Sequence, residues 1–294
     1  MESWTIKEPT TLTFDVVKNL RIKTISGAVD VVGTDARPTL EVTSISGKDL
    51  EVRLDDDGYL DIGYPDGPRW PGLIDWLTGH GARTSVRLSV AVPPDCKVDV
   101  EMVSVTTVVS GIDGQVRVNG ISGDVTLARL ADVEAGSISG SIEAERISGT
   151  FAAKTVSGGI TAAGLSGRAA VAETVSGAVT LDIETPVPTM HLTTVSGDAT
   201  VRVPHKSDLD VRLTTTSGQV ASSFAEIRSS GLPGSRSADG TIGAGGPRLR
   251  AHTVSCHITL LRRNEDYGGP GGAEGDGAER QDSPLAESAD EDTQ

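Results

Sequence analysis

The fold is decided by the stretch TVSGGITA at residues 155–162, because its pattern recurs along most of the chain. In each copy, Val or Ile, Ser and Gly are followed by alternating apolar residues. Such repetition is typical of a stack of similar units, each of which buries its apolar face only against its neighbours. The other copies are TISGAVDV at 24–31, GISGDVTL at 120–127, SISGSIEA at 137–144, RISGTFAA at 146–153, TVSGAVTL at 174–181, TVSGDATV at 194–201 and TVSCHITL at 253–260.

The spacing of the copies predicts how the stack is built. Serines of the phrase at 139, 148, 157, 166 and 176 are nine or ten residues apart, and the better copies recur every 17 to 21 residues. A strand of about five residues and a tight turn account for half of such a period. The sequence therefore predicts an all-β, single-domain parallel β-solenoid with two short strands in each coil of 18–20 residues.

Alternation within the phrase predicts which side chains are buried. We expect strands with one apolar and one polar face, as in a half-buried sheet. In the copy at 155–162 the expected apolar face consists of Val156, Gly158, Ile160 and Ala162, and the expected polar face of Thr155, Ser157 and Thr161.

The glycine and serine of the phrase are explained by structure. Glycine tolerates a positive φ and the close approach of another chain segment, and both are useful where a solenoid turns a corner. Serine can hydrogen-bond to its own turn or to the next coil. A nucleophile or a phosphate-binding loop should occur once, whereas this phrase occurs repeatedly. Cys256 replaces the glycine in the last copy, so we expect that corner to need no positive φ.

Composition divides the chain into a repeat domain and a tail. The tail, residues 264–294, holds ten acidic residues and one basic residue and so carries −9 of the net charge of −15. We expect it to be disordered. The predicted parts are a solenoid domain at 1–263, made of a β-rich start at 1–67, an insertion at 68–83, the regular repeat at 84–221, a flexible loop at 222–242 and a closing coil at 243–263.

Charge and segment composition also indicate cellular context. A basic stripe, which nucleic-acid binding requires, is missing from the sequence. Neither a secretory signal nor an apolar run long enough to span a membrane is present. The two cysteines, Cys96 and Cys256, follow no redox or metal-binding spacing. We therefore expect a cytoplasmic protein that binds no nucleic acid, does not integrate into a membrane and keeps both thiols reduced.

Catalytic and metal-binding motifs are not found. The phrase HTVSCH places His252 and Cys256 on one side of a strand and His257 on the other, so two ligands at most converge, whereas zinc requires three or four. The acidic run at Asp55–Asp57 is better explained by a hairpin turn at Asp57-Gly58 than by a cation site. The sequence therefore predicts no cofactor, no metal and no enzymatic activity.

The insertion at 68–83 interrupts the repeat and is the candidate partner contact. It is rich in large apolar residues, as interface anchors often are. Its alternative role is a cap that covers an open edge of the solenoid. The residues concerned are Trp70, Leu73, Ile74, Trp76 and Leu77.

Two further segments carry a family resemblance. LSVAVPPDCKVDVEMVSV at 88–105 leads into the repeat, and GAGGPRLRAHTVSCHITLLRR at 243–263 closes it. With the copies between them, they make residues 10–263 resemble the bacterial family of adhesin-type β-strand repeats, a domain of unknown function also called toastrack. The resemblance implies a β-solenoid without established catalytic residues, in a family linked with cell-envelope stress systems.

These observations together favour a non-enzymatic protein-interaction or scaffold module with an unidentified protein partner. The alternatives are an extracellular adhesin-like protein and a carbohydrate-active β-helix enzyme. An enzyme of that kind needs acidic or basic side chains clustered on the coils, but the outward positions of the best copies are Thr, Ser, Gly and Ala.

Overall fold

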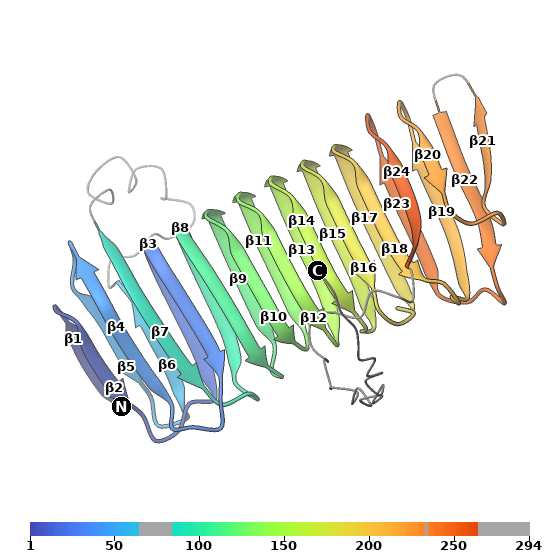
Figure 1. The fold of residues 1–294 in the computed structure, drawn as a ribbon. Helices are drawn as coiled ribbons and strands as arrows, with labels where there is room; N and C mark the ends of the chain where they lie inside the picture. Colours follow the sequence, from blue (N-terminus) through green and yellow to red (C-terminus); the bar gives the residue numbers. More distant parts are fainter. Residues whose placement is uncertain (65–83, 233–234, 264–294) are drawn as a thin grey trace, which may run out of the picture. The chain divides into compact units, whose positions relative to one another are not determined.

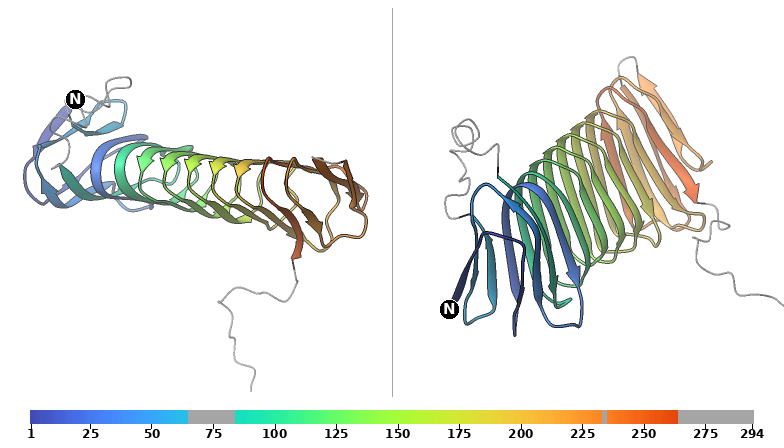
Figure 2. Two further views of the ribbon diagram at one scale, coloured as in Figure 1. Left: turned by 90° about the horizontal axis from the view of Figure 1, so that it is seen from above. Right: turned by 60° about the vertical axis from the view of Figure 1, so that its left-hand side comes forward.

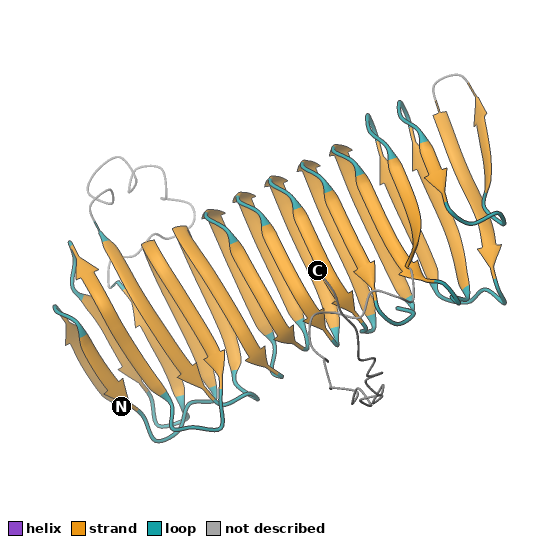
Figure 3. Ribbon diagram, viewed as in Figure 1, coloured by secondary structure: helices purple, strands orange, loops and turns teal. Residues whose placement is uncertain are grey.

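The structure, a computed structural model, describes residues 1–64, 84–232 and 235–263. The predicted insertion at 68–83 and the predicted tail at 264–294 therefore lie outside the described residues, as do residues 65–67 and 233–234. Residues 1–264 form one compact unit. Every regular element described in it is a β-strand (Figure 3). In this part of the chain we find no helix with the length and apolarity that crossing a membrane requires.

One continuous 24-stranded sheet wraps nearly round an axis, so that its two halves face each other as two walls (Figures 1 and 2). The long strands β3 (Asn19–Gly33) and β8 (Lys97–Ile112) bend and belong to both walls. In spatial order the first wall contains β1 (Glu2–Ile6), β5 (Leu50–Leu54), β6 (Tyr59–Gly63), β3, β8, β9 (Val116–Ser122), β11 (Val133–Ser139), β13 (Thr150–Ser157), β15 (Ala169–Ser176), β17 (Thr189–Ser196), β23 (Arg248–Thr253), β19 (Leu209–Thr215), β22 (Ser235–Ile242) and β21 (Arg228–Leu232). The second wall contains β2 (Thr10–Thr13), β4 (Thr39–Ser46), β7 (Ser85–Val92), β3, β8, β10 (Val125–Leu130), β12 (Ile142–Ile147), β14 (Ile160–Leu165), β16 (Val179–Ile183), β18 (Ala199–Pro204), β24 (Ile258–Arg263) and β20 (Val220–Ser222).

The middle of the sheet is a parallel β-solenoid, as the sequence predicts. Phe151 on β13 pairs with Val133 on β11 and with Ala170 on β15, so one coil takes 18 or 19 residues. Each coil supplies one strand to each wall. The Ser-Gly phrase occurs at both corners of a coil. Ser148-Gly149 lies at the corner between β12 and β13, and Ser157-Gly158 lies at the opposite corner, between β13 and β14. This explains the nine- or ten-residue spacing of the serines.

The core lies between the walls and is built mainly from aliphatic side chains. Leu127, Ile142 and Ile160 are fully buried at successive levels of the second wall, and Phe151 faces them from the first wall. Burying a side chain of this size contributes about 1.5–3 kcal/mol. The space between the two walls holds one layer of side chains from each wall, and side chains as small as Val, Ile, Leu and Ala fit there.

The predicted burial phase is wrong on the first wall. Thr155 is 5% exposed and Val156 is 49% exposed, whereas Ile160 on the second wall is fully buried, as expected. The two inward positions, Thr155 and Ile160, are five residues apart, an odd number. The corner between them, which contains Gly158 and Gly159, therefore reverses the alternation, and the prediction had continued it unbroken through the glycines.

Close approach of the coils explains most corner glycines. A Cβ on Gly177 would lie 2.0 Å from the carbonyl oxygen of Gly158 in the preceding coil. Among the glycines of the phrase at this corner, only Gly27 and Gly123 have a positive φ, of 120° and 107°. Cys256 does not have a positive φ, which confirms the expectation for that corner.

Antiparallel strands form the N-terminal end of the sheet. β1 pairs with β5 and β5 with β6, while β2 pairs with β4 and β4 with β7. The predicted turn at Asp57-Gly58 is confirmed. The carboxylate of Asp55 accepts hydrogen bonds from the backbone N–H groups of Asp57 (3.0 Å) and Tyr59 (2.8 Å).

The C-terminal end differs from the prediction in two ways. Strand β23 lies between β17 and β19, and β24 lies between β18 and β20, so the coil at 243–263 is inserted one level before the end of the stack. Segment 222–242, predicted as a flexible loop, contains the hairpin β21–β22. Strand β22 pairs antiparallel with β19 and covers its open edge. The hairpin is rich in Ser and Arg, and polar or charged side chains on an edge strand disfavour pairing with another chain.

Candidate functional site

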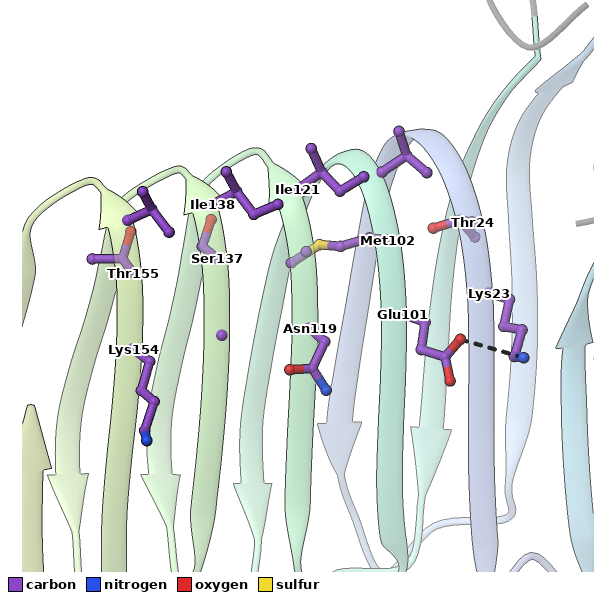
Figure 4. A pocket seen from close by; sticks show the side chains of 14 residues that line it. Lys23, Thr24, Glu101, Met102, Asn119, Ile121, Ser137, Ile138, Lys154 and Thr155 are labelled. Atoms are coloured by element: carbon purple, nitrogen blue, oxygen red, sulfur yellow. Dashed lines mark ion pairs between the residues drawn. The ribbon is translucent and has the colours of Figure 1, made fainter. Parts of the chain in front are cut away.

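A groove runs across several coils on the outer side of the first wall, next to the Ser-Gly corner (Figure 4). Its volume is about 620 Å³, which is within the usual range for ligand sites. The groove lies over the strand backbone, between two rows of outward side chains. One row is apolar and the other is polar.

The apolar row is formed by the Val or Ile that precedes Ser-Gly in five copies of the phrase, together with Val103, which precedes Ser104-Val105 at the same place on β8. We call it the corner row; its members are Val103, which is only 7% exposed, and Ile121, Ile138, Val156, Val175 and Val195. The first four line the groove, and the last two continue the row beyond it. Ile138 and Val195 are each 42% exposed, and Val156 and Val175 are each 49% exposed. Aliphatic side chains repeated at each coil form a contiguous apolar strip, which soluble proteins seldom leave open without a use.

The polar row follows the register of the strands. Its members are Lys23, Glu101, Asn119, Gly136 and Lys154, each paired with the next across β3, β8, β9, β11 and β13. The Nζ of Lys23 lies 3.3 Å from Oε2 of Glu101. At the other end of the row, the Nζ of Lys154 lies 3.1 Å from the carboxylate of Glu173.

Gly136 supplies no side chain to the polar row. A Cβ at this position would come within 2.8 Å of Oδ1 of Asn119, so the Asn119 amide already occupies part of the space beside Gly136. The polar groups at this point of the groove are therefore the Asn119 amide and the Lys154 ammonium.

Glu101 is the carboxylate of the groove lining. Burial opposes its ionisation, but the hydrogen bond from Nη2 of Arg21 (2.7 Å) and the charges of Lys23 and Arg21 outweigh burial and lower its pKa. Burial, followed by the charge of Glu101, raises the pKa of the neighbouring Asp99. At neutral pH Glu101 is thus ionised and already neutralised by its neighbours. A general acid needs the opposite, a carboxyl group that keeps its proton.

A column of hydroxyl side chains lies beneath the groove. Thr24, Ser137 and Thr155 are buried, and their hydroxyl groups have no hydrogen-bond partner among the described residues. Two coils further on, the hydroxyl of Thr194 donates to the carbonyl oxygen of Gly177 at 3.4 Å. Each member of the column is at the position of the first residue of the TVSG phrase, and this side chain points into the core.

Of the residues singled out from the sequence, those of the HTVSCH phrase lie within the described ranges. Trp70, Leu73, Ile74, Trp76 and Leu77 lie outside the described residues. In the HTVSCH phrase, the backbone N–H of His257 donates to Oδ1 of Asp198 (3.0 Å), and its Nδ1 lies 3.3 Å from the same atom. Within the described ranges, no group of three or more His, Cys, Asp or Glu side chains is placed to hold a metal ion.

Sequence reasoning missed the groove, although its signal is present in the phrase. In TVSG, the threonine and the valine are adjacent, so they must face opposite sides of the strand. An inward threonine exposes the valine, and the corner that begins at the following glycine permits the change of phase. The corner row could therefore have been predicted by treating each strand separately.

Comparisons with known proteins give one family match and several structural matches. The sequence profile of the family described as Toastrack DUF4097 matches residues 79–261, more than half of the chain. Two crystal structures, each described as a "putative adhesin", are similar to it. The one from Parabacteroides distasonis is 13% identical, with 89% of this chain and 97% of that chain covered and a TM-score of 0.44. The one from Bacteroides fragilis is 11% identical, with 87% and 98% covered and a TM-score of 0.43. The search of curated proteins found no match.

Proposed function

This chain belongs to the Toastrack DUF4097 family, and we propose that it is a non-enzymatic interaction module whose corner row and groove hold a protein partner. The observation that carries the proposal is the exposure of the corner row. Four aliphatic side chains at successive coils, from Ile138 to Val195, are each 42–49% exposed.

The length of the corner row favours a protein over a small molecule. Strands in a sheet are about 4.8 Å apart, so the three steps between the exposed members Ile138 and Val195 span about 14 Å, and the four steps from the half-buried Ile121 span about 19 Å. The groove occupies only the first part of this length. An apolar strip with polar flanks matches the usual arrangement of a protein interface, in which an apolar centre is surrounded by a polar rim.

The chemistry of the groove supports binding rather than catalysis. Its lining contains Glu101, which Arg21 and Lys23 neutralise, and Lys154, which is paired with Glu173. Hydrolysis of a glycosidic bond would need two carboxyl groups on either side of the substrate, one of them with a raised pKa. The purified protein should therefore release no sugar from a glycan, and release of sugar would contradict this part of the proposal.

We further propose that the protein acts in the cytoplasm, in a system that responds to envelope stress. Support comes from the two cysteines, which are both free, because disulfides are typical of exported proteins. Fractionation of native cells, with antibody detection of the protein, tests this location. Recovery on the cell surface would instead favour the adhesin-like alternative.

Site-specific photocrosslinking in native cells tests the interaction surface. Benzoylphenylalanine placed at Val156 should crosslink a discrete partner, and substitution of Val175→Ser on the same protein should reduce the yield. The matched control is the same probe at Thr180, an exposed position on the second wall. Equal crosslinking from both positions, or a partner captured only from Thr180, would overturn the proposed surface.

A further inference from the structure

Charge is unevenly distributed along the stack. Residues 1–204 hold 27 acidic and 17 basic residues, a net charge of −10, whereas residues 205–263 hold four acidic and eight basic residues, a net charge of +4. The C-terminal coils are thus positively charged in a chain that is otherwise strongly acidic. These coils lie outside the groove, whose lining comes from β3, β8, β9, β11 and β13.

Exposed arginines of the first wall come together in these coils, on the neighbouring strands β23 and β19 and on β21, which β22 separates from β19. Figure 1 shows these strands at the C-terminal end of the sheet. We call this surface the arginine face; its members are Arg212, Arg228, Arg248 and Arg250, all of which are exposed. Arg250 pairs in register with Arg212 on one side and with His191 on the other. Two guanidinium groups therefore occupy adjacent positions on neighbouring strands.

These arginines lack the counter-ions that arginines elsewhere in the chain have. Within the described ranges none of the four comes within 4.0 Å of a carboxylate, whereas Arg21, Arg117 and Arg168 each do. Asp210 shares the face, but its oxygens accept hydrogen bonds from Oγ1 of Thr241 (3.0 Å) and from the backbone N–H of Gly246 (3.3 Å). Asp239 also lies on the face, opposite Arg212 on one side and Arg228 on the other in the strand register, but neither arginine is within 4.0 Å of a carboxylate among the described residues.

Such an arrangement favours an anionic ligand. Like charges directly opposite each other on neighbouring strands are destabilising. A guanidinium group offers paired N–H donors whose geometry matches a carboxylate. A ligand that brings carboxylates to Arg212 and Arg250 would remove the repulsion and form charge-assisted hydrogen bonds with both.

We propose that the arginine face binds a short acidic segment of a protein partner in extended conformation. Arg248 and Arg250 are two residues apart on β23, a distance of about 7 Å along the strand. Carboxylates at alternate positions of an extended peptide have the same spacing. The segment must be short, because a long polyanion would continue onto coils whose net charge is negative and be repelled there.

Binding of a defined peptide to the full-length protein tests the proposal. The probe is fluorescein-labelled (Glu-Ser)6, followed by fluorescence anisotropy, with (Lys-Ser)6 as the charge-reversed probe. The double variant R212Q/R250Q should bind (Glu-Ser)6 at least about tenfold more weakly than the native protein, and added salt should reduce the difference. The (Lys-Ser)6 probe should not bind to the face.

The matched control is the double variant R87Q/K97Q, which removes two exposed cations that lie on β7 and β8 and have no ion pair in the described part of the chain. It should change binding less than twofold, and the thermal unfolding of both variants should match that of the native protein. An equal loss in both variants would show that only net charge matters and would overturn the site. Tighter, Arg212- and Arg250-dependent binding of a single-stranded oligonucleotide or of phosphatidylglycerol vesicles would overturn the acidic segment as the ligand.

Discussion

The carbonyl oxygen of Gly158 lies directly against Gly177 in the next coil, 2.0 Å from the point where a Cβ on Gly177 would stand. The φ of Gly177 is not positive, so left-handed backbone strain is not the reason for a glycine here. It is the approach of the preceding coil that excludes a side chain from this position. The same contact recurs between Gly140 and Gly158 and between Gly177 and Gly197.

Gly177→Ala should therefore destabilise the protein by about 3 kcal/mol, because a methyl group forced against backbone cannot be accommodated by moving a side chain. Gly159→Ala is the matched control, since its Cβ would lie 3.6 Å from the nearest atom, the carbonyl oxygen of Ala178. That control should be neutral or slightly stabilising, because alanine restricts the unfolded chain. Urea denaturation measures both, and equal losses would contradict the close-approach explanation.

The buried threonines beneath the corner row should respond unequally to the same substitution. The hydroxyl of Thr253 donates to the carbonyl oxygen of Cys256 at 2.8 Å, whereas that of Thr155 is buried without a partner among the described residues. Thr253→Val should cost about 1 kcal/mol of stability, and Thr155→Val should be neutral or should stabilise by up to about 1 kcal/mol. Similar losses in both variants, measured by thermal unfolding, would show that Thr155 has a partner after all.

The same column shows how far the sequence can be interpreted. The repeat period predicts the solenoid, the two strands in each coil and the position of the corners, because each of these depends on local spacing. The burial phase depends on how many residues the corner takes up, and from Thr155 to Ile160 that count is odd. If one alternation is continued through the corner, Thr155 is predicted to be exposed and Val156 to be buried, which is the reverse of the structure. The exposed corner row is then not predicted.

The thiols should differ in reactivity. Cys96 is fully buried, and burial raises the pKa of its thiol to about 12. Cys256 is half-buried at the corner. We expect Ellman's reagent to modify one thiol in the folded protein and the second only after denaturant is added, since the thiolate is the reactive form. The variant Cys256→Ser should show no reactive thiol before unfolding, and a fast reaction in that variant would contradict the burial of Cys96.

Asp132 should make the stability depend on pH. Its Oδ1 accepts a hydrogen bond from the backbone N–H of Thr150 (2.7 Å), and both its oxygens accept from Arg168; these two contacts, in that order, lower its pKa. A lowered pKa means that the stabilisation is present above the ordinary aspartate value of about 3.9 and is lost as pH falls through the lower folded value. Because the side chain is 41% exposed, we expect a contribution near 1 kcal/mol.

Asp132→Asn should accordingly be less stable than the native protein at pH 7 and approach it at about pH 3, as measured by urea denaturation at both pH values. The control is Asp35→Asn, because Asp35 is exposed and makes no ion pair within the described residues. A difference between Asp132→Asn and the native protein that stays constant with pH would show that the carboxylate charge is not the cause.

The C-terminal order of strands shows a second limit of sequence interpretation. The copy at 253–260 fits between two coils as well as it would fit at the end, because Thr253 pairs with Thr194 on one side and with Thr215 on the other. Phrases this similar do not specify which neighbour each strand pairs with. In the structure the hairpin β21–β22 covers one edge of β19, and the last coil takes the place between β17 and β19.

Arg129 tests a strained position at the far corner. Its φ is 53°, and Arg146, at the same place in the next coil, has a φ of 57°. Glycine occupies this place in the coil before Arg129 (Gly111, φ 71°) and in the coil after Arg146 (Gly164, φ 69°). The left-handed conformation costs a residue with a Cβ about 1–2 kcal/mol, and glycine avoids this at a smaller loss of chain entropy. Arg129→Gly should therefore raise the stability by about 0.5–1 kcal/mol, whereas Arg129→Ala, which keeps the Cβ, should not. If thermal unfolding shows the same gain for both variants, the gain comes from removing the long charged side chain and not from relief of the backbone.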